Sequence, residues 1–559
     1  MASDASSGHN LADRFAFIGV AFLSVYAALV LVPWAFLAVG LSVAAWMVPL
    51  AVLVATGALY LLAGSDRPRT VGLALMIVGS VLLVGVVIAL SFYDASVDGR
   101  WYHQSAVISL ADGWNPISNA DPGFVPGLQY VRSYPKGFWI AAAALYELFG
   151  SIEVGKSLHV LPLGASFFLT LSLLVRFRVR TGWAVVAAGL AAANPIWILE
   201  SLSFYLDGQI ASLLLVALVS ALWQVYEVGN RLSIGALSLS LILLVNLKFT
   251  GLFYAGLILL ALGGTLLWQR RRVELRRAIA VYAVVLGVAV GVVGFNPYVQ
   301  NTLDFGNPFY PLYGEGSVDF ITDNTPINLR GASQVAQLTY GIFGKPANPI
   351  EHEAELTVPF SPSSLSVQFP YTGPGARTAG FGPLFSGALV LALAGLVWVA
   401  IRQHGKGARL LVILTVGFLL VTVVAHPEGW WARYTPQLWL VPIVVMVGAW
   451  AVNSRLMTWM GAVLGVVLVA NLVYVVGPYS RGSIDYRRDI QHMYAPFVEG
   501  SEVMALHLTS FAYQAATITQ LEEAGVRFLD YGSVQGLPCP SPQPLVNGAG
   551  VYCLAGEAG

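Results

Sequence analysis

The chain has 559 residues, of which 57% are hydrophobic and only 10% are charged, and its 29 basic residues balance its 29 acidic ones. Soluble proteins average about 25% charged residues. The composition therefore excludes an ordinary soluble enzyme, a disordered chain and a nucleic-acid-binding protein that relies on a basic surface. Many apolar runs reach the roughly 20 residues that cross a bilayer, so the sequence predicts an all-α polytopic membrane protein.

The apolar runs predict about 13 transmembrane helices. The first is followed too closely by others to be only a cleaved signal peptide. In chain order the predicted spans are residues 14–32, 41–63, 71–92, 157–175, 183–199, 209–226, 233–247, 250–268, 278–295, 381–401, 409–425, 434–451 and 456–477. The apolar stretch 137–150 is too short to cross a bilayer, and we expect it to form a re-entrant or interfacial helix.

Basic residues gather in alternate connections, notably at 176–180 and 270–277. Positive charge marks the cytoplasmic side, so the N-terminus should lie inside and the C-terminus outside a bacterial cytoplasmic (inner) membrane. The sequence predicts that the chain divides into three parts. Residues 1–70 form two accessory helices, 71–478 form the main membrane module with outer loops 93–156 and 296–380, and 479–559 form an extracytoplasmic tail.

The tail has mixed polarity and should form a small α/β appendage. The pieces VMALHL and VRFLDYG are strand-like, and a helical pattern lies around 510–524. Cys539 and Cys553 are the only cysteines of the chain. Outside the cytoplasm they could form a disulfide, and two free buried thiols are the alternative.

Ionisable residues beside a membrane span are costly and therefore mark candidate sites. Asp94 and Asp98 leave the third span four residues apart, so on a helical continuation they would share one face. Such a pair could supply a general base with an orienting partner, or hold a divalent ion such as Mg²⁺ or Mn²⁺. Tyr102 and His103 follow and could bind a hydroxylated or anionic ligand. The alternative is that the acids populate an outside loop and cap a helix, with the aromatic residues in an interfacial belt.

Two cationic residues lie at predicted outer turns. Lys136 follows Tyr134 at the entrance of the short helix 137–150, where a lipid headgroup would arrive, although snorkelling to the interface would also explain it. Lys248 interrupts the apolar stretch 233–268 and suits the phosphate of a lipid-linked substrate, or else is a connector lysine in water.

Two further outer positions complete the set. Asp207 stands at the mouth of a span, where it could bind substrate or cap the helix. Arg433 begins a late span after Trp430; arginine pairs with phosphate in two-pronged fashion, and tryptophan stacks on sugar rings or sits among headgroups. The chain has no CxxC, HExxH or GxxxxGK[ST] motif, which disfavours zinc and nucleotide chemistry.

The arrangement of these residues resembles that in the GT-C superfamily of integral-membrane glycosyltransferases. The likeness is strongest to bacterial relatives of protein O-mannosyltransferases and of the lipid A aminoarabinose transferase. The resemblance covers roughly residues 70–450. It rests on four ordered motifs, which are Asp98-x-x-x-Tyr102-His103 followed by GWNP, Tyr134-Pro135-x-Gly137, Gly306-Asn-Pro-Phe-Tyr-Pro311, and Arg433-Tyr434 followed by Pro436. Asp207 and Lys248 also fall where such enzymes carry an acid and a lysine. The two helices before residue 71 and the tail depart from the family pattern.

The resemblance implies transfer of a sugar, a hexose or a pentose, from a polyprenyl-phosphate donor to a glycan, lipid or protein acceptor at the outer face. The catalytic base maps onto Asp98, with Asp94 as the second choice. Lys248, Arg433 and Tyr434 would bind the donor phosphate, and Lys136 would form a lateral gate for the lipid. The alternatives are a transporter or flippase of lipid-linked sugars, an O-antigen-ligase type of enzyme with a polyprenyl-pyrophosphate donor, and a non-catalytic assembly protein.

Overall fold

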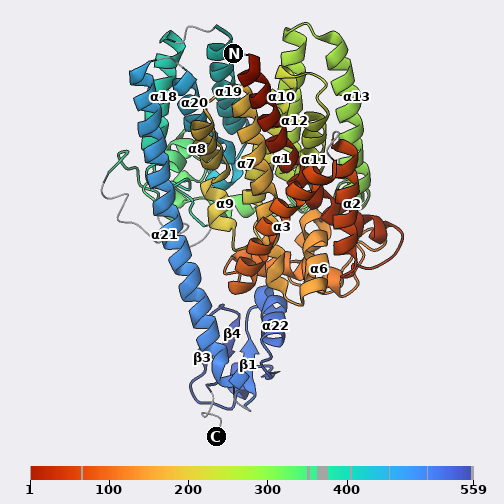
Figure 1. Cartoon of the computed structure of the whole chain (residues 1–559). Helices are drawn as coiled ribbons and strands as arrows, with labels where there is room; N and C mark the ends of the chain where they lie inside the picture. The colour runs from red at the N-terminus through yellow and green to blue at the C-terminus, as the bar shows by residue number, and fades with distance from the viewer. Residues whose placement is uncertain are drawn as a thin grey trace.

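The computed structural model describes residues 2–63, 67–348, 353–361, 375–402, 406–451, 454–499 and 502–554. Parts of the predicted outer loop 296–380 lie outside these residues, and so do the last five residues of the predicted tail. The molecule is a bundle of long helices from which one helix, α21, continues to a small domain at the far end (Figure 1). The N-terminus and the C-terminal domain lie at opposite ends of the bundle.

Apolar segments in lipid must satisfy their own backbone hydrogen bonds, and the helix does this within one segment. The helices of the bundle, in chain order, are α1 (Ala2–Ala38), α2 (Met47–Leu62), α3 (Arg67–Ser91), α4 (Gln104–Ala111), α5 (Leu128–Ser133), α6 (Gly137–Phe149), α7 (Val160–Arg176), α8 (Thr181–Ala192), α9 (Pro195–Glu200), α10 (Asp207–Tyr226), α11 (Arg231–Leu247), α12 (Phe249–Trp268), α13 (Arg272–Val288), α14 (Gln300–Phe305), α15 (Phe320–Asn324), α16 (Gln334–Phe343), α18 (Phe385–Arg402), α19 (Lys406–Ala425), α20 (Leu440–Ala451) and α21 (Arg455–Glu499).

The predicted all-α polytopic class is confirmed. Each predicted span falls on helical structure. Among the described residues, eight helices are long and apolar enough to cross a membrane, judged by length and composition, and further apolar helices have 10–17 residues. The side of the membrane that each end faces stays a prediction.

The predicted span 183–199 is broken in two, which corrects the single helix expected there. Helix α8 ends at Ala192, and α9 begins at Pro195 after a non-helical Asn194. The Asn194 side chain accepts a hydrogen bond from Ile196 N at 3.0 Å. Proline disfavours helical backbone in the residue before it, and asparagine is a strong helix N-cap, so the Asn-Pro pair starts a new helix.

Helix α1 is integral to the bundle. It packs along α7 and α2 and also contacts α11, α6 and α3. The Leu11–Ala38 segment has 89% of its most apolar window buried inside the protein. The division of the chain at residue 70 stays a prediction, but the first helix is a central packing element.

Helix α6 is the short apolar helix predicted at 137–150. Its residues from Gly137 to Leu145 are buried, and it packs against α4, α1 and the 3-10 helix η2 (Ile152–His159). A Cβ on Gly137 would lie 2.7 Å from Asn246 O, so glycine permits the close approach of α6 to the end of α11. The helix is therefore enclosed by protein along most of its length, and whether it is re-entrant or interfacial stays a prediction.

The C-terminal domain is the predicted α/β appendage. Its sheet has the order β2-β1-β4-β3, formed by β1 (Met504–Leu508), β2 (Phe528–Asp530), β3 (Gln543–Pro544) and β4 (Gly550–Tyr552), with helix α22 (Gln514–Glu523) packed beside it. Strands β1 and β2 are parallel, and β1 and β4 are antiparallel. Cys539 and Cys553 form a disulfide, the first of the two states left open by the sequence. The boundary at 479 falls inside α21, whose 45 residues extend well past the predicted span.

Candidate functional site

A buried carboxylate joins two cations at the start of α10. Asp207 is the first residue of that helix, and its side chain is 2% exposed. One carboxylate oxygen pairs with Lys248 Nζ, and the other accepts from Arg433 Nε at 2.8 Å. The three residues come from α10, from the turn between α11 and α12, and from the short helix η7 (Ala432–Tyr434). The structure thus brings together three of the predicted site residues, and Asp207 is their common partner.

Asp98 lies at the edge of this cluster. Its Oδ2 is 3.8 Å from Arg433 Nη2, and its side chain is 27% exposed, so a ligand can reach it. Burial raises the pKa of Asp98 above its usual value, while Arg433, Lys248 and a hydrogen bond with Tyr205 act in the opposite direction. Arg433 therefore lies between two carboxylates, one closed off and one accessible.

Aromatic rings line the cluster. The Arg433 guanidinium carbon lies 4.5 Å from the ring centre of Tyr205 and 5.1 Å from that of Trp431. Lys248 Nζ lies 4.8 Å from the ring centre of Tyr434. These cation–π contacts add to the ion pairs and help to hold both cations in place.

The sequence-based choice of Trp430 is not supported by the geometry. Trp430 donates to Glu428 Oε2 at 3.0 Å, whereas its neighbour Trp431 lies against Arg433. Trp431 also lies 5.2 Å from the guanidinium of Arg377, whose Nε donates to Asn324 O at 2.8 Å. Two adjacent tryptophans look alike in sequence, and only the backbone direction at η7 decides which one faces the arginine.

Asp94 has a structural position, unlike Asp98. It is fully buried in a non-helical segment, and its carboxylate accepts from Ser96 N at 2.7 Å and from Phe204 N at 2.9 Å. The two acids therefore do not share a helix face, which corrects the sequence-based expectation. The cause is that the chain leaves α3 in an extended loop, and helical structure resumes only at Val97. Burial and the neighbouring Glu153 raise the pKa of Asp94 to about 6.

Tyr102, His103 and Tyr134 form an aromatic cluster next to the site. His103 Nδ1 accepts from Trp139 Nε1 at 2.7 Å, which leaves the proton of a neutral ring on Nε2. The ring of Tyr102 lies 5.6 Å from that of Tyr134, which lies 5.6 Å from Phe249. Tyr102 and His103 are buried, so they shape the wall of the site through ring packing.

Lys136 is enclosed and does not reach an open headgroup position. It is 3% exposed, and its Nζ donates to the carbonyl oxygens of Arg132, at 3.0 Å, and of Tyr134. The rings of Trp114 and Trp139 lie 5.9 and 5.4 Å from the ammonium. These contacts satisfy the carbonyl groups at the end of α5, so Lys136 joins α5 to α6 and is not free to receive a lipid phosphate.

Glu200 is a site residue that the sequence analysis did not select. It is fully buried at the end of α9, its Oε2 accepts from Gly208 N at 2.6 Å, and its Oε1 has no hydrogen-bond partner. Arg433 and Glu200 both line a small cavity of about 10 Å³, close to the space that one water molecule needs. An ionised carboxylate with an unpaired buried oxygen is costly, which favours the protonated form of this group. The sequence signal that could have pointed to Glu200 is its place as an acidic residue at the end of an apolar run.

An apolar groove opens near Lys248. It has a volume of about 320 Å³ and lies between α12, η3 (Ala289–Val293), α14 and the segment Gly306–Pro311. Leu252, Tyr298 and Phe309 are among its walls. Phe249, directly after Lys248, contacts both Tyr298 and Phe309, with ring centres 5.6 and 5.8 Å away. The predicted motif at 306–311 therefore contributes to a wall of this groove.

The predicted metal pair does not form a metal site. Asp94 and Asp98 direct their carboxylates to different partners, as described above. Over the described part of the chain, no group of three or more His, Cys, Asp or Glu side chains is arranged to hold a metal ion. The described residues therefore do not fit the Mg²⁺ or Mn²⁺ ion left open by the sequence.

The fold and the site define a polytopic membrane protein with a cluster of alternating charges where α10, the turn between α11 and α12, and η7 meet. No protein-family model matches the chain, and no curated protein matches it. A structural comparison finds the crystal structure of ArnT from Cupriavidus metallidurans bound to undecaprenyl phosphate, with 15% sequence identity over 87% of this chain and 99% of that chain. The TM-score of this match is 0.39.

Proposed function

We propose that the protein is a glycosyltransferase that moves a sugar from a polyprenyl-phosphate donor to an acceptor at the outer face of a bacterial cytoplasmic membrane. The observation that carries the proposal is the accessible carboxylate of Asp98, 3.8 Å from an arginine that shares a buried aspartate with a lysine. This arrangement offers a base for a hydroxyl group next to two cations for a phosphate. The transferred sugar is a hexose or a pentose, and the acceptor is a glycan, a lipid or a protein.

In the proposed reaction Asp98 accepts the proton of the acceptor hydroxyl as that oxygen attacks the anomeric carbon. The new bond joins the acceptor oxygen to the sugar. The bond between the anomeric carbon and the phosphate oxygen breaks, and its electron pair leaves with the polyprenyl phosphate. Asp207 engages Nε of Arg433, and Asp98 is 3.8 Å from Nη2, beyond hydrogen-bond distance, so the terminal nitrogens keep hydrogens to donate to the phosphate.

The charges of the cluster support this sequence of events. Asp98 and Asp207 balance Arg433 and Lys248, and Glu200 adds no charge while it is protonated. When Asp98 takes the proton, the four charged groups pass from neutral to one net positive charge. At the same time the phosphate passes from a diester with one negative charge towards a monoester with two. The two cations thus lose one of the negative charges that balance them while the leaving group becomes more negative. This stabilises the transition state selectively.

The apolar groove beside Lys248 supports a lipid-linked donor. Its walls are almost entirely apolar, and Phe249 joins them to the lysine. A polyprenyl chain in this groove would bring its phosphate towards Lys248. In this proposal Phe249 and the segment 306–311 take the place at the lipid entrance that the sequence analysis gave to Lys136.

The test is sugar transfer by the purified protein with a panel of polyprenyl-phosphate sugars, comparing wild type with Asp98→Asn and Asp94→Asn. We expect transfer or donor hydrolysis in the wild type and a loss of about 10²–10⁴-fold in Asp98→Asn, the usual contribution of a general base. Donor binding should persist in this variant, because one negative charge is removed beside the phosphate. Asp94→Asn should lower folding stability more than it lowers kcat/KM for the donor.

Near-normal turnover of Asp98→Asn would remove Asp98 as the base. Turnover of no donor by wild type, together with movement of lipid-linked sugars across proteoliposomes, would replace the glycosyltransferase with a transporter. Turnover only of pyrophosphate-linked donors would indicate the ligase type of enzyme.

A further inference from the structure

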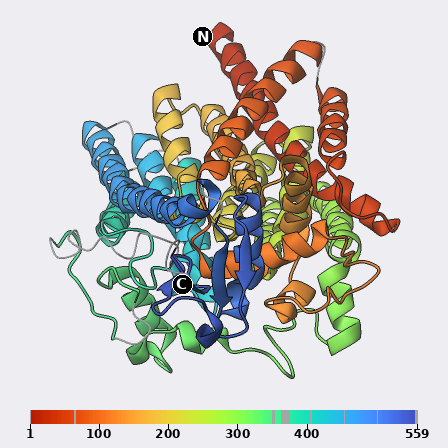
Figure 2. The same cartoon turned by 90° about the horizontal axis from the view of Figure 1, so that it is seen from below.

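We propose that the C-terminal domain positions the base of the site by holding segment 94–103, which carries Asp98, through the side chain of Arg100. This inference rests on the proposed function in giving Asp98 its catalytic role. The physical hold of the domain on the segment is independent of that role. Seen from below, the strands of the domain lie over the bundle (Figure 2), and helix α22 of the domain contacts α4.

Arg100 connects the segment to the C-terminal domain. It is 7% exposed and lies in η1 (Gly99–His103), a π-helical turn that begins directly after Asp98. Its Nε donates to Ser96 O at 3.2 Å, and its Nη1 donates to Asn547 O. Its guanidinium carbon lies 4.3 Å from the ring centre of Tyr513. One side chain thus joins the backbone on the N-terminal side of Asp98 to two residues of the C-terminal domain.

The acceptor for Arg100 is itself firmly held. Asn547 is 3% exposed, and its side chain donates to Thr517 Oγ1 at 3.0 Å and accepts from Ala549 N at 3.1 Å. Thr517 is buried on α22 and Ala549 directly precedes β4. The carbonyl group of Asn547 is therefore fixed by the helix and the sheet of the domain, so it offers Arg100 a rigid partner.

A second connection lies at the start of the segment. Glu153 accepts from Asp94 N at 3.2 Å and from Gln520 Nε2 at 3.0 Å, and it pairs with Lys156 at 2.6 Å. Because Gln520 is on α22, the buried Glu153 carboxylate links the C-terminal domain to the backbone of the segment four residues before Asp98. The segment is therefore attached to the domain on both sides of the base.

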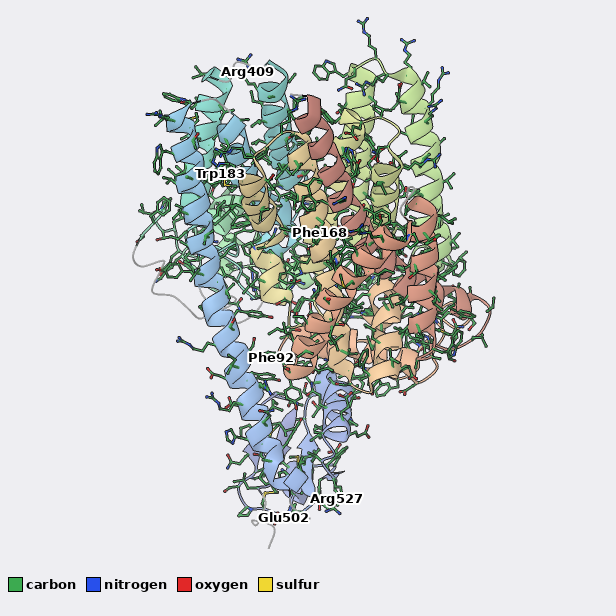
Figure 3. All side chains as sticks on the ribbon, viewed as in Figure 1. Phe92, Phe168, Trp183, Arg409, Glu502 and Arg527 are labelled. Carbon is green, nitrogen blue, oxygen red and sulfur yellow. A yellow bond between two sulfur atoms is a disulfide. The ribbon has the colours of Figure 1, made fainter. Side chains whose placement is uncertain are left out.

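A third contact attaches α22 to the bundle near Glu153. Glu523 accepts from Ile152 N at 2.7 Å and from Ser151 Oγ at 2.8 Å. On α21, Arg487 lies 5.7 Å from the ring centre of Phe92, and Figure 3 shows Phe92 beside α21 where the bundle meets the domain. Contacts from both α22 and α21 thus join the domain to the bundle.

The segment has few means of fixing itself. Residues 93–96 are non-helical, and the turn that follows is π-helical, with wider and weaker hydrogen bonding than an α-helix. A Cβ on Gly99 would lie 2.1 Å from Asp94 Oδ2, so glycine is required for the chain to fold back over that carboxylate. The position of Asp98 relative to Arg433 therefore depends on contacts from outside the segment. Tyr205 bonds Asp98 itself and Phe204 N bonds Asp94, and Arg100 adds the connection to the C-terminal domain.

The test combines hydrogen exchange with steady-state kinetics on the full-length protein, comparing wild type with Arg100→Gln and Arg100→Lys. In Arg100→Gln, amides 97–104 should exchange at least about tenfold faster, because local opening no longer breaks the bonds to the domain. Turnover should fall by about 10–100-fold, as expected for a base displaced by about 1 Å, with the donor KM within about twofold of wild type. Arg100→Lys should recover part of the turnover, because a lysine keeps one donor and the contact with Tyr513.

Tyr513→Leu provides a second variant in case Arg100→Gln does not fold. It removes only the ring beneath the guanidinium, so its effects should be smaller and of the same kind. Arg488→Gln is the matched control, because Arg488 forms an exposed pair with Asp485 on α21, with side chains 63% and 55% exposed. This control should change neither exchange in the segment nor turnover.

Wild-type exchange rates at 97–104 in the variants would overturn the inference, and so would a raised donor KM with unchanged turnover. The exchange measurement needs no substrate. A wild-type protein that transfers no sugar would therefore refute the proposed function alone, and exchange would still decide whether the domain holds the segment.

Discussion

Asp207→Asn tests the interpretation of Asp207 as the shared counter-ion of the cluster. The substitution preserves shape but removes the charge that faces Arg433 Nε at 2.8 Å and Lys248 Nζ. The side chains of Asp207, Arg433 and Lys248 are 2%, 10% and 19% exposed, so water screens them little. Two cations would then lie together without their buried partner.

The expected cost is about 3–5 kcal/mol of folding stability, the usual range when one member of a buried ion pair is removed. With an unfolding entropy of about 2.1 cal/mol/K per residue, this corresponds to a drop of roughly 3–4 °C in the thermal midpoint. An added polyprenyl phosphate should recover more stability in the variant than in wild type, because its phosphate replaces the missing negative charge.

The assay is thermal unfolding in detergent with and without polyprenyl phosphate. Asp304→Asn is the control, because Asp304 pairs with Arg132 at 2.7 Å on the surface, with side chains 25% and 34% exposed. Such a pair contributes about 0.2–1 kcal/mol. If Asp207→Asn loses no more stability than Asp304→Asn, or gains no more from the added lipid phosphate than wild type does, the buried counter-ion interpretation is wrong.

Three further predictions concern the base, the protonated acid and the C-terminal domain. Because burial raises the pKa of Asp98, activity should fall with decreasing pH along an acid limb above the usual carboxylate range; Tyr205→Phe removes a hydrogen bond that lowers this pKa, so the limb should move to higher pH, and a shift to lower pH would contradict the assignment. Glu200→Gln should remain near wild type in stability, whereas Glu200→Ala should cost about 1–3 kcal/mol by leaving a backbone N–H unpaired; thermal midpoints compare the two, and equal losses would refute the role of that hydrogen bond. Cys539→Ser should lower the stability of the C-terminal domain by about 3 kcal/mol, because its bond with Cys553 closes a loop of 14 residues; unchanged resistance of the domain to limited proteolysis would argue against this.

The sequence by itself determined the architecture. Hydrophobic runs of about 20 residues predict helices because a bilayer leaves the backbone no other partner for its hydrogen bonds, and this requirement is local to each segment. The strands and the helix of the tail were likewise readable from short patterns. The predicted span 183–199 is instead broken at Asn194-Pro195. This pair is a local signal that starts a new helix, and it outweighs the hydrophobicity of the segment.

The chemistry of individual site residues was only partly contained in the sequence. Asp98, Asp207, Lys248 and Arg433 were selected because charges beside membrane spans are costly, and they do converge. Sequence spacing could not separate Asp98 from Asp94, since the choice depends on Phe204 N, which arrives from another part of the chain.

Tertiary packing decided the remaining roles. Trp431 replaces its neighbour Trp430 at the arginine because of the backbone direction, and Lys136 is taken up by the carbonyl groups at the end of α5. Glu200 gains significance only because it has an unpartnered buried oxygen and lines a cavity together with Arg433. Hydrophobic burial is a property of a segment and can be read along the chain. A polar group's role is set by partners that can lie hundreds of residues away, and only the folded structure brings them within bonding distance.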